Sequence, residues 1–144
     1  MPNTDPFDLE RFLGAQAGSY ATALSEIRAG RKRSHWIWYI FPQLRGLGVS
    51  STSEHYGISG LDEARAYLSH PVLGPRLVQC AEALLSLNGR TASAIMPYPD
   101  DLKLRSSMTL FERVAGPGSV FSRVLEKYYG ANRDERTLAL LGDT

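Results

Sequence analysis

Residues 34–45 read SHWIWYIFPQLR, and no other part of the chain is so dense in large side chains. Six consecutive apolar residues, Trp36 to Phe41, cannot all face water, so the segment must be buried on most sides. Such a run fits a buried strand or a short helix that is apolar all round, and periodicity does not separate the two. We favour a helix because helical patterns surround the segment, and we expect the rest of the chain to pack around it.

Polar residues flank this aromatic block on both sides. In a helix, His35 and Trp38 share one face at i, i+3 spacing. Pro42 ends the element, which places Gln43 and Arg45 in a turn just beyond it. A buried anchor that presents polar groups in a turn is one way to build a binding site. His35, Gln43 and Arg45 are therefore candidate ligand-binding residues; the alternative is that the aromatics are core and the polar groups are solvated.

The composition indicates a soluble globular protein. Its 144 residues suit a single domain, 1–144, with a loose N-terminus over residues 1–6. Hydrophobic residues make up 43% of the chain and charged residues 22%, proportions that are typical of globular domains. The net charge of +1 and a pI near 7.9 give no global electrostatic reason to expect a nucleic-acid or membrane partner.

The sequence shows no targeting or metal-binding signal. No apolar run approaches the roughly 20 residues of a membrane span, and the start, MPNTDPFDLE, is not a signal sequence, so we expect a cytoplasmic protein. Cys80 lies in an apolar helical pattern and is interpreted as a buried small hydrophobe. Histidines at positions 35, 55 and 70 lack metal-site spacing, so we expect neither a metal nor a cofactor.

Apolar residues recur at helical spacing along most of the remaining chain. The pattern predicts helices over Phe7 to Arg28, from Ser59 or Gly60 to His70, from Pro71 to Gly89, over Ala92 to Met96, less regularly over Asp100 to Phe111, over Val120 to Tyr129 and over Asp134 to Leu141. The first is interrupted near Gly14 and Gly18, so one kinked helix or two shorter ones fit. We predict an all-α, compact single domain of about six to eight helices.

Residues 46–60, GLGVSSTSEHYGISG, are rich in glycine and serine and are predicted to be a loop or a set of turns. A loop of this length often lines a functional site. Glu54, His55 and Tyr56 within it are groups able to move protons. Neighbouring residues seldom point the same way, so at most two of the three can serve one site. Glu54 is the candidate catalytic residue and Tyr56 a candidate ligand contact.

Two basic segments could hold an anion. Lys103 and Arg105 lie beside the small hydroxyls of Ser106 and Ser107, a combination that suits an anionic group. The alternative is structural: Asp100 and Asp101 cap the helix, the serines permit close helix packing, and the cations are solvated or paired with Asp101. The second segment is residues 31–33, RKR. We interpret these cations as stabilising the negative end of the preceding helix, and the alternative is a phosphate-binding patch.

Together these segments suit a planar, anionic small molecule. The indoles of Trp36 and Trp38 can stack on a flat group, while nearby cations and hydroxyls supply charge-assisted hydrogen bonds. A nucleotide or an ADP-ribose-like group has both features.

Four stretches resemble the bacterial domain-of-unknown-function family numbered 1810. They are SHWIWYIFPQLRGLG, YGISGLDEARAYLSHPVLGPRL, DDLKLRSSMTLF and the closing VFSRVLEKYYG with TLALL. The likeness extends from about residue 7 to residue 141. It implies a compact, mainly α-helical single domain and does not imply an activity.

A shorter stretch, TSEHY at residues 52–56, resembles a signature of the NADAR family. Members of that family are mainly helical and include N-glycosidases that act on ADP-ribose linked to a base and on related riboside intermediates. The resemblance implies an active-site role for Glu54. Gly57 and Ile58 depart from that family's continuation, which is Phe-Gln.

Three functions are compatible with these observations. The first is a glycosidic-bond hydrolase in which Glu54 is the general base or stabilises an oxocarbenium-like transition state, a tryptophan stacks, and Lys103 and Arg105 hold phosphate. The second is a non-catalytic binder that uses the same pocket. The third is a helical interaction module, in which case a homo-oligomer is compatible with the sequence.

Overall fold

The structure, a computed structural model, describes residues 5–142. Within this range the chain forms ten helices and no strand. They are α1 Glu10–Ala17, α2 Tyr20–Arg28, α3 Ile37–Ile40, α4 Ser51–Tyr56, α5 Leu61–Ser69, α6 Leu73–Ser86, α7 Ala92–Ile95, α8 Asp100–Ala115, α9 Val120–Tyr129 and α10 Glu135–Leu140. The predicted all-α class is confirmed. The predicted number of helices is too low, because four helices of four to six residues supplement the six longer ones.

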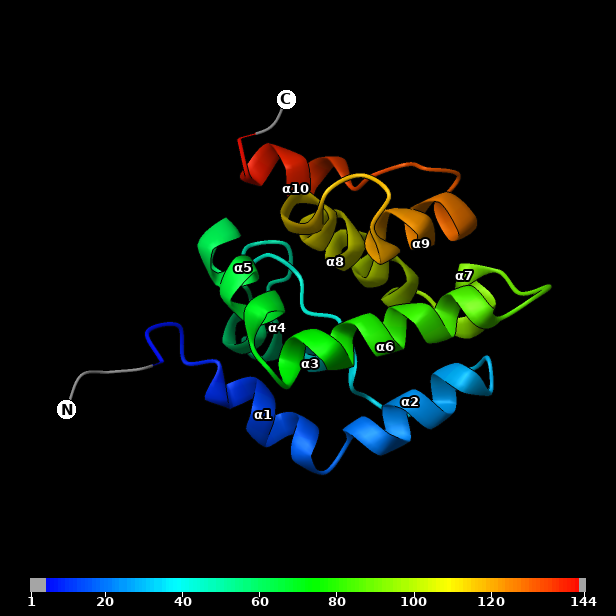
Figure 1. Cartoon of the computed structure of the whole chain (residues 1–144), viewed down its shortest axis with the longest axis horizontal. Coiled ribbons are helices and arrows are strands. Elements are labelled where there is room, and N and C mark those ends of the chain that lie inside the picture. Colours follow the sequence, from blue (N-terminus) through cyan, green and yellow to red (C-terminus); the bar gives the residue numbers. More distant parts are fainter. Residues whose placement is uncertain (1–4, 143–144) are drawn as a thin grey trace.

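The longest helices form the middle of the molecule. α6 runs across the centre of Figure 1, with α1 and α2 on one side and α8, α9 and α10 on the other. α6 contacts α2, α5 and α9, while α8 contacts α5, α9 and α10. The approach of α5 to α6 requires a glycine: a Cβ at Gly74 would lie 2.0 Å from the carbonyl oxygen of Leu68. Large side chains from nearly every helix fill one hydrophobic core.

The aromatic block contains a short helix, as predicted. α3 spans four residues, and Trp36, Ile37, Ile40 and Phe41 are all buried. Beyond Pro42 the chain pairs briefly with the segment after α4: the Ile58 N–H donates to Gln43 O at 2.9 Å, and the Arg45 N–H donates to Ile58 O at 2.8 Å. This pairing holds the turn after α3 beside the end of α4.

One predicted loop is partly wrong. Residues 46–60 contain the short helix α4, which begins after Ser50 because the Ser50 hydroxyl accepts the Ser53 N–H at 3.1 Å. A serine cap is a helix-start signal that the surrounding glycines and serines obscure. Two other boundaries differ from the prediction, because α1 begins at Glu10 and α8 continues past Phe111 to Ala115. Around the remaining helices the signals act as predicted: α1 and α2 are separate helices around Gly18, Gly130 ends α9 in the left-handed region, and Asp134 caps α10.

A buried ion pair fixes α1 against α4 and α5. Arg11 donates to Glu63 at 2.7 Å and to the carbonyl oxygens of Phe7, Asp8, His55 and Gly57. The other carboxylate oxygen of Glu63 accepts the N–H and the hydroxyl of Ser59. We call this set of contacts the Arg11 clamp. It determines where the C-terminal end of α4, next to Glu54, lies.

The remaining expectations concern the N-terminus and Cys80. Of the predicted loose segment, residues 1–4 lie outside the described residues, whereas Asp5 accepts the N–H groups of Leu9 and Glu10 at 2.7 and 3.0 Å. Cys80 is buried, as predicted, and burial raises the pKa of its thiol to about 12. Among residues 5–142, no helix is both long enough and apolar enough to cross a membrane.

Candidate ligand-binding groove

Two hollows lie on either side of Lys103. The first, of about 380 Å³, is lined by residues 32–35 and 97–100 together with Trp38 and Lys103. The second, of about 310 Å³, is lined by Gln43, Leu47, Gly48, Pro99, Leu102, Lys103, Arg105, Ser106, Asp134 and Arg136. They share Pro99 and Lys103, and we call them together the Lys103 groove. The groove therefore unites His35, Trp38, Gln43, Lys103, Arg105 and Ser106 from the residues that the sequence singles out.

The groove concentrates positive charge. Five cationic residues and two acidic ones line it, a net charge of +3 in a chain whose total is +1. Within the described part of the chain, the guanidinium groups of Arg33 and Arg136 have no hydrogen-bond or ion-pair partner. Arg31 lies in a neighbouring hollow that shares Lys32 and Arg33. The basic run thus borders the groove, and its role is not confined to the end of α2.

An acid bridges two lysines in the first hollow. Asp100 lies 2.7 Å from the ammonium of Lys32 and 3.7 Å from that of Lys103. Each ammonium also lies over an indole ring: Lys32 is 5.1 Å from the ring centroid of Trp36, and Lys103 is 4.9 Å from that of Trp38. The two cations are thereby held close together although like charges repel. An added anion at this point would meet two positioned donors.

In the second hollow, too, an acid pairs with a cation. Arg105 lies 3.6 Å from Asp134, whose backbone N–H donates to Thr109 at 2.9 Å. Arg136 belongs to α10, so the hollow joins α8 to the C-terminal helix. Ser106 donates its hydroxyl to Leu102 O at 3.1 Å. The predicted cations are paired, but their partners are Asp100 and Asp134, one from each hollow.

Buried polar atoms without partners occur on the elements that form this groove. Among the described residues four such side-chain atoms occur: Trp38 Nε1, Asp101 Oδ1, Arg105 Nε and Ser107 Oγ. Three belong to α8, and the fourth lies under Lys103. Each unpaired buried group costs roughly 1 to 3 kcal/mol, and such groups are rare in folded proteins. Because all four lie on α3 or α8, the interior beside the groove is less stable than it would be with these groups paired.

A carboxylate outside the groove holds its first wall in place. Glu26 of α2 accepts the N–H groups of Arg33 and Ser34, the Ser34 hydroxyl, and Trp36 Nε1, all between 2.6 and 2.9 Å. Partial burial raises the pKa of Glu26, but these four hydrogen bonds favour the charged form more strongly and bring the pKa down to about 2. Glu26 is therefore a positioning residue for the loop between α2 and α3.

The other candidate residues lie away from the groove lining. Trp36 is 1% exposed, with its N–H bonded to Glu26, so it is a core residue that cannot stack on a ligand. Ser107 is fully buried. Arg45 is exposed and donates to Gly57 O at 3.2 Å, while the Tyr56 ring packs against Phe12, Tyr39 and His55.

Glu54 is exposed on α4. Its neighbour Ser53 lies against the second hollow, since a Cβ at Gly48 would come within 2.5 Å of the Ser53 hydroxyl oxygen. The same added Cβ would lie 3.6 Å from the amide nitrogen of Gln43. The structure thus places Ser53 beside the groove lining, and Glu54 is not among the residues that line either hollow.

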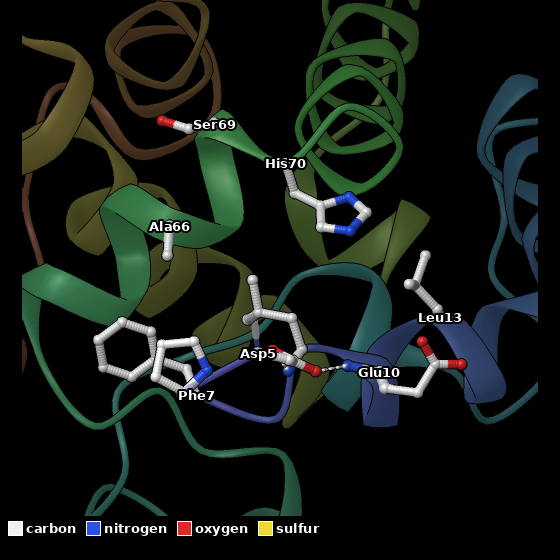
Figure 2. A pocket seen from close by; sticks show the side chains of 9 residues that line it. Asp5, Phe7, Glu10, Leu13, Ala66, Ser69 and His70 are labelled. Atoms are coloured by element: carbon white, nitrogen blue, oxygen red, sulfur yellow. Dashed lines mark hydrogen bonds between the residues drawn. The ribbon is translucent and has the colours of Figure 1, made fainter. Parts of the chain in front are cut away.

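A further pocket lies at the N-terminal end of α1. Figure 2 shows this pocket of about 400 Å³ between the N-terminal segment, α1 and the end of α5. Its polar groups already serve the backbone. Asp5 caps the start of α1, and Nδ1 of His70 accepts the N–H groups of Val72 and Leu73 at the start of α6. The Lys103 groove is consequently the stronger candidate site.

Sequence reasoning missed several groove residues. Tyr98, Asp100, Asp134 and Arg136 line the two hollows, and only their positions in the fold reveal this. Among them, the large side chain of Tyr98 is 76% exposed. Within residues 5–142, no group of three or more histidine, cysteine, aspartate or glutamate side chains could hold a metal ion.

Comparisons with known proteins place the chain in a family. The model of the family described as "Protein of unknown function (DUF1810)" matches residues 6–141, so the chain belongs to the DUF1810 family. It is similar to the crystal structure of the conserved hypothetical protein Rv1873 from Mycobacterium tuberculosis, with 54% sequence identity and a TM-score of 0.94 over 97% of this chain and 100% of that one. No curated protein matches the sequence significantly.

Proposed function

We propose that this member of the DUF1810 family binds a small anionic ligand with a planar aromatic group in the Lys103 groove. The observation that carries the proposal is the clustering of unpaired buried polar atoms on the elements that form these two basic hollows. Two of those atoms, Trp38 Nε1 and Arg105 Nε, are donors from residues that line the first and second hollow respectively. An anion supplies acceptors, and its charge offsets the local excess of +3.

The size and chemistry of the groove suit a small molecule. Its hollows of about 380 and 310 Å³ lie at the lower end of the range for ligand pockets, and together they accommodate a nucleotide-sized molecule. Trp38 and Tyr98 offer aromatic surface, while Lys103 provides a charge between the hollows. Nucleotides and ADP-ribosyl groups combine a flat base with phosphates and are the ligand class that we propose.

Hydrolysis of a glycosidic bond is the reaction that we propose for this site. Glu54 would accept a proton from water as the water attacks the anomeric carbon and the bond to the leaving nitrogen breaks. The likeness of residues 52–56 to the NADAR signature supports Glu54 in this role, and Ser53, the residue before it, lies close to Gly48 of the second hollow.

A thermal-shift screen tests the proposed binding, and product analysis tests the proposed hydrolysis. The panel consists of nucleotides, ADP-ribose, NAD and riboside phosphates. A ligand at about 100 times its Kd stabilises the fold by roughly 2.7 kcal/mol, which raises Tm by several degrees. We expect Lys103→Met to abolish the shift, Arg123→Met on α9 to leave it unchanged, and Glu54→Gln to retain binding but lose turnover. A panel without any shift, or an equal shift in Lys103→Met, would contradict the binding proposal.

The exposed apolar residues support a second function, that of a protein-interaction module. Val49 is 99% exposed and follows Gly48 of the second hollow, while Tyr98 and Leu102 line the groove and are also exposed. An apolar rim of this kind is a candidate protein-interaction site, because contiguous exposed apolar surface marks such sites. Sedimentation of the purified chain across a concentration series, with Val49→Ser as the variant, tests self-association through this rim.

A further inference from the structure

We propose that the ligand lies in the Lys103 groove in one orientation, with its aromatic group in the first hollow and a distal phosphate in the second. The ligand class is accordingly a nucleoside diphosphate or a diphosphate ester. A nucleoside monophosphate would fill only part of the groove. This inference rests on the proposed function, because it specifies the ligand of the same groove.

The two hollows differ in the surface that they offer. The first contains the indole of Trp38, the exposed ring of Tyr98 and the imidazole of His35. The lining of the second has no aromatic residue; its polar side chains include Gln43, Arg105 and Arg136. Base–aromatic stacking is worth about 1 to 3 kcal/mol per base, so a ligand gains most when its flat group occupies the first hollow.

Lys103 is the common wall and defines the position of the proximal phosphate. Its ammonium lies over Trp38, so an aromatic group beside that indole brings the adjoining phosphate to Lys103. Lys32 is held nearby through Asp100 and adds a second charge on the same side. A single phosphate at this position would contact Lys103 and Lys32 and would not need the cations of the second hollow.

The cations of the second hollow remain available beyond Lys103. Arg105 is paired with Asp134 only at 3.6 Å and has an unpaired buried Nε, and Arg136 is without a partner among the described residues. Lys103 belongs to both hollows, and Arg105 and Ser106 of the second follow it by two and three residues, so they lie within one helical turn, roughly 5 Å, of Lys103 along α8. A second phosphate linked to the first extends from Lys103 to these guanidinium groups, which bind phosphate through two parallel hydrogen bonds.

Isothermal titration with AMP, ADP and inorganic pyrophosphate against two variants tests this orientation. In the wild type we expect ADP to bind at least 10-fold more tightly than AMP, because charge-assisted hydrogen bonds to the distal phosphate are added. Arg136→Ala should remove that difference and leave AMP binding unchanged. Tyr98→Ala should weaken AMP and ADP by the same factor, about 5- to 10-fold, and leave pyrophosphate unchanged. Arg123→Ala removes one exposed charge from α9 and is the matched control.

The outcomes separate this inference from the proposed function. Equal affinity for AMP and ADP, or an equal loss of both in Arg136→Ala, overturns the two-phosphate orientation while the groove remains an anion site. A loss of pyrophosphate binding in Tyr98→Ala overturns the assignment of the aromatic group to the first hollow. If none of the three ligands binds, both the inference and the proposed nucleotide site are wrong. Thermal unfolding of each variant without ligand confirms that it is folded.

Discussion

Replacement of Arg11 by methionine should destabilise the protein more than any other single change of a charged residue that we propose. The guanidinium uses all five of its N–H groups: one reaches Glu63 and four reach carbonyl oxygens. Its side chain is 7% exposed and that of Glu63 is 2% exposed. Methionine preserves the apolar contact with Phe12, over whose ring the guanidinium lies at 4.4 Å, and removes every donor.

The expected magnitude follows from burial. Removal of one partner from a buried ion pair costs about 3 to 5 kcal/mol because the other charge remains without compensation. For a chain of 144 residues this corresponds to a decrease in Tm of roughly 10 to 20 °C. The control is Arg65→Met, which breaks the exposed pair between Arg65 and Asp62 on α5 and should cost less than about 1 kcal/mol.

A double variant makes the test sharper. In Arg11→Met/Glu63→Gln the carboxylate charge is gone, and the amide oxygen can still accept from Ser59. The double variant should therefore be more stable than Arg11→Met alone, although it carries one change more. Urea unfolding followed by circular dichroism gives the three free energies. The reasoning fails if the two losses simply add, or if Arg11→Met costs no more than Arg65→Met.

Three further predictions concern single hydrogen-bonded acids and a cap. The pKa of Glu26 is lowered to about 2, so the stability that its charged form contributes is complete above the unfolded pKa near 4.5 and is lost as the pH falls towards 2. Glu26→Gln should therefore lower the free energy of unfolding by roughly 1 to 2 kcal/mol at pH 7 and by little at pH 2, as measured by urea unfolding. Asp100→Asn should increase the affinity for phosphate-containing ligands several-fold in isothermal titration, because the two lysines lose their internal counter-ion. His70→Ala should lose about 1 kcal/mol in thermal unfolding, since Nδ1 no longer accepts the first N–H groups of α6, whereas His70→Asn should lose less.

Local pattern accounts for the parts of the fold that the sequence predicts correctly. The apolar spacing of α6 and α9, the glycine after α9 and the aspartate before α10 all act over a few residues, and each is where it is expected. α4 was missed because its helical signal, the Ser50 cap, lies among glycines and serines that favour turns. The helix count was low for the same reason, since short helices depend on contacts with distant elements more than on their own pattern.

The candidate site was less predictable because it is assembled from distant segments. Lys103, Arg105 and Ser106 stood out as a cation and hydroxyl cluster, and the structure places all three in the groove lining. The residues that meet these cations are not evident from local pattern: Asp100 contacts Lys32, which is 68 positions away in sequence, and Arg136 joins the hollow only because α10 packs on α8. A contact of this kind is a property of the tertiary fold, and one sequence carries no local trace of it.

The residues that hold the groove in place are distinct from those that face it. Glu26 fixes the loop of Arg33 and Ser34, and Thr109 fixes Asp134, so the shape of the groove depends on contacts outside its lining. Arg33 and Arg136 contribute no partner contact to the fold within the described residues, and they lie in a region of excess positive charge. Like charges in one place weaken the compact state. Neutral replacements at these two positions should therefore leave Tm unchanged or raise it slightly while they weaken the binding of a diphosphate such as ADP, which is the expected relation between stability and function at the proposed ligand site.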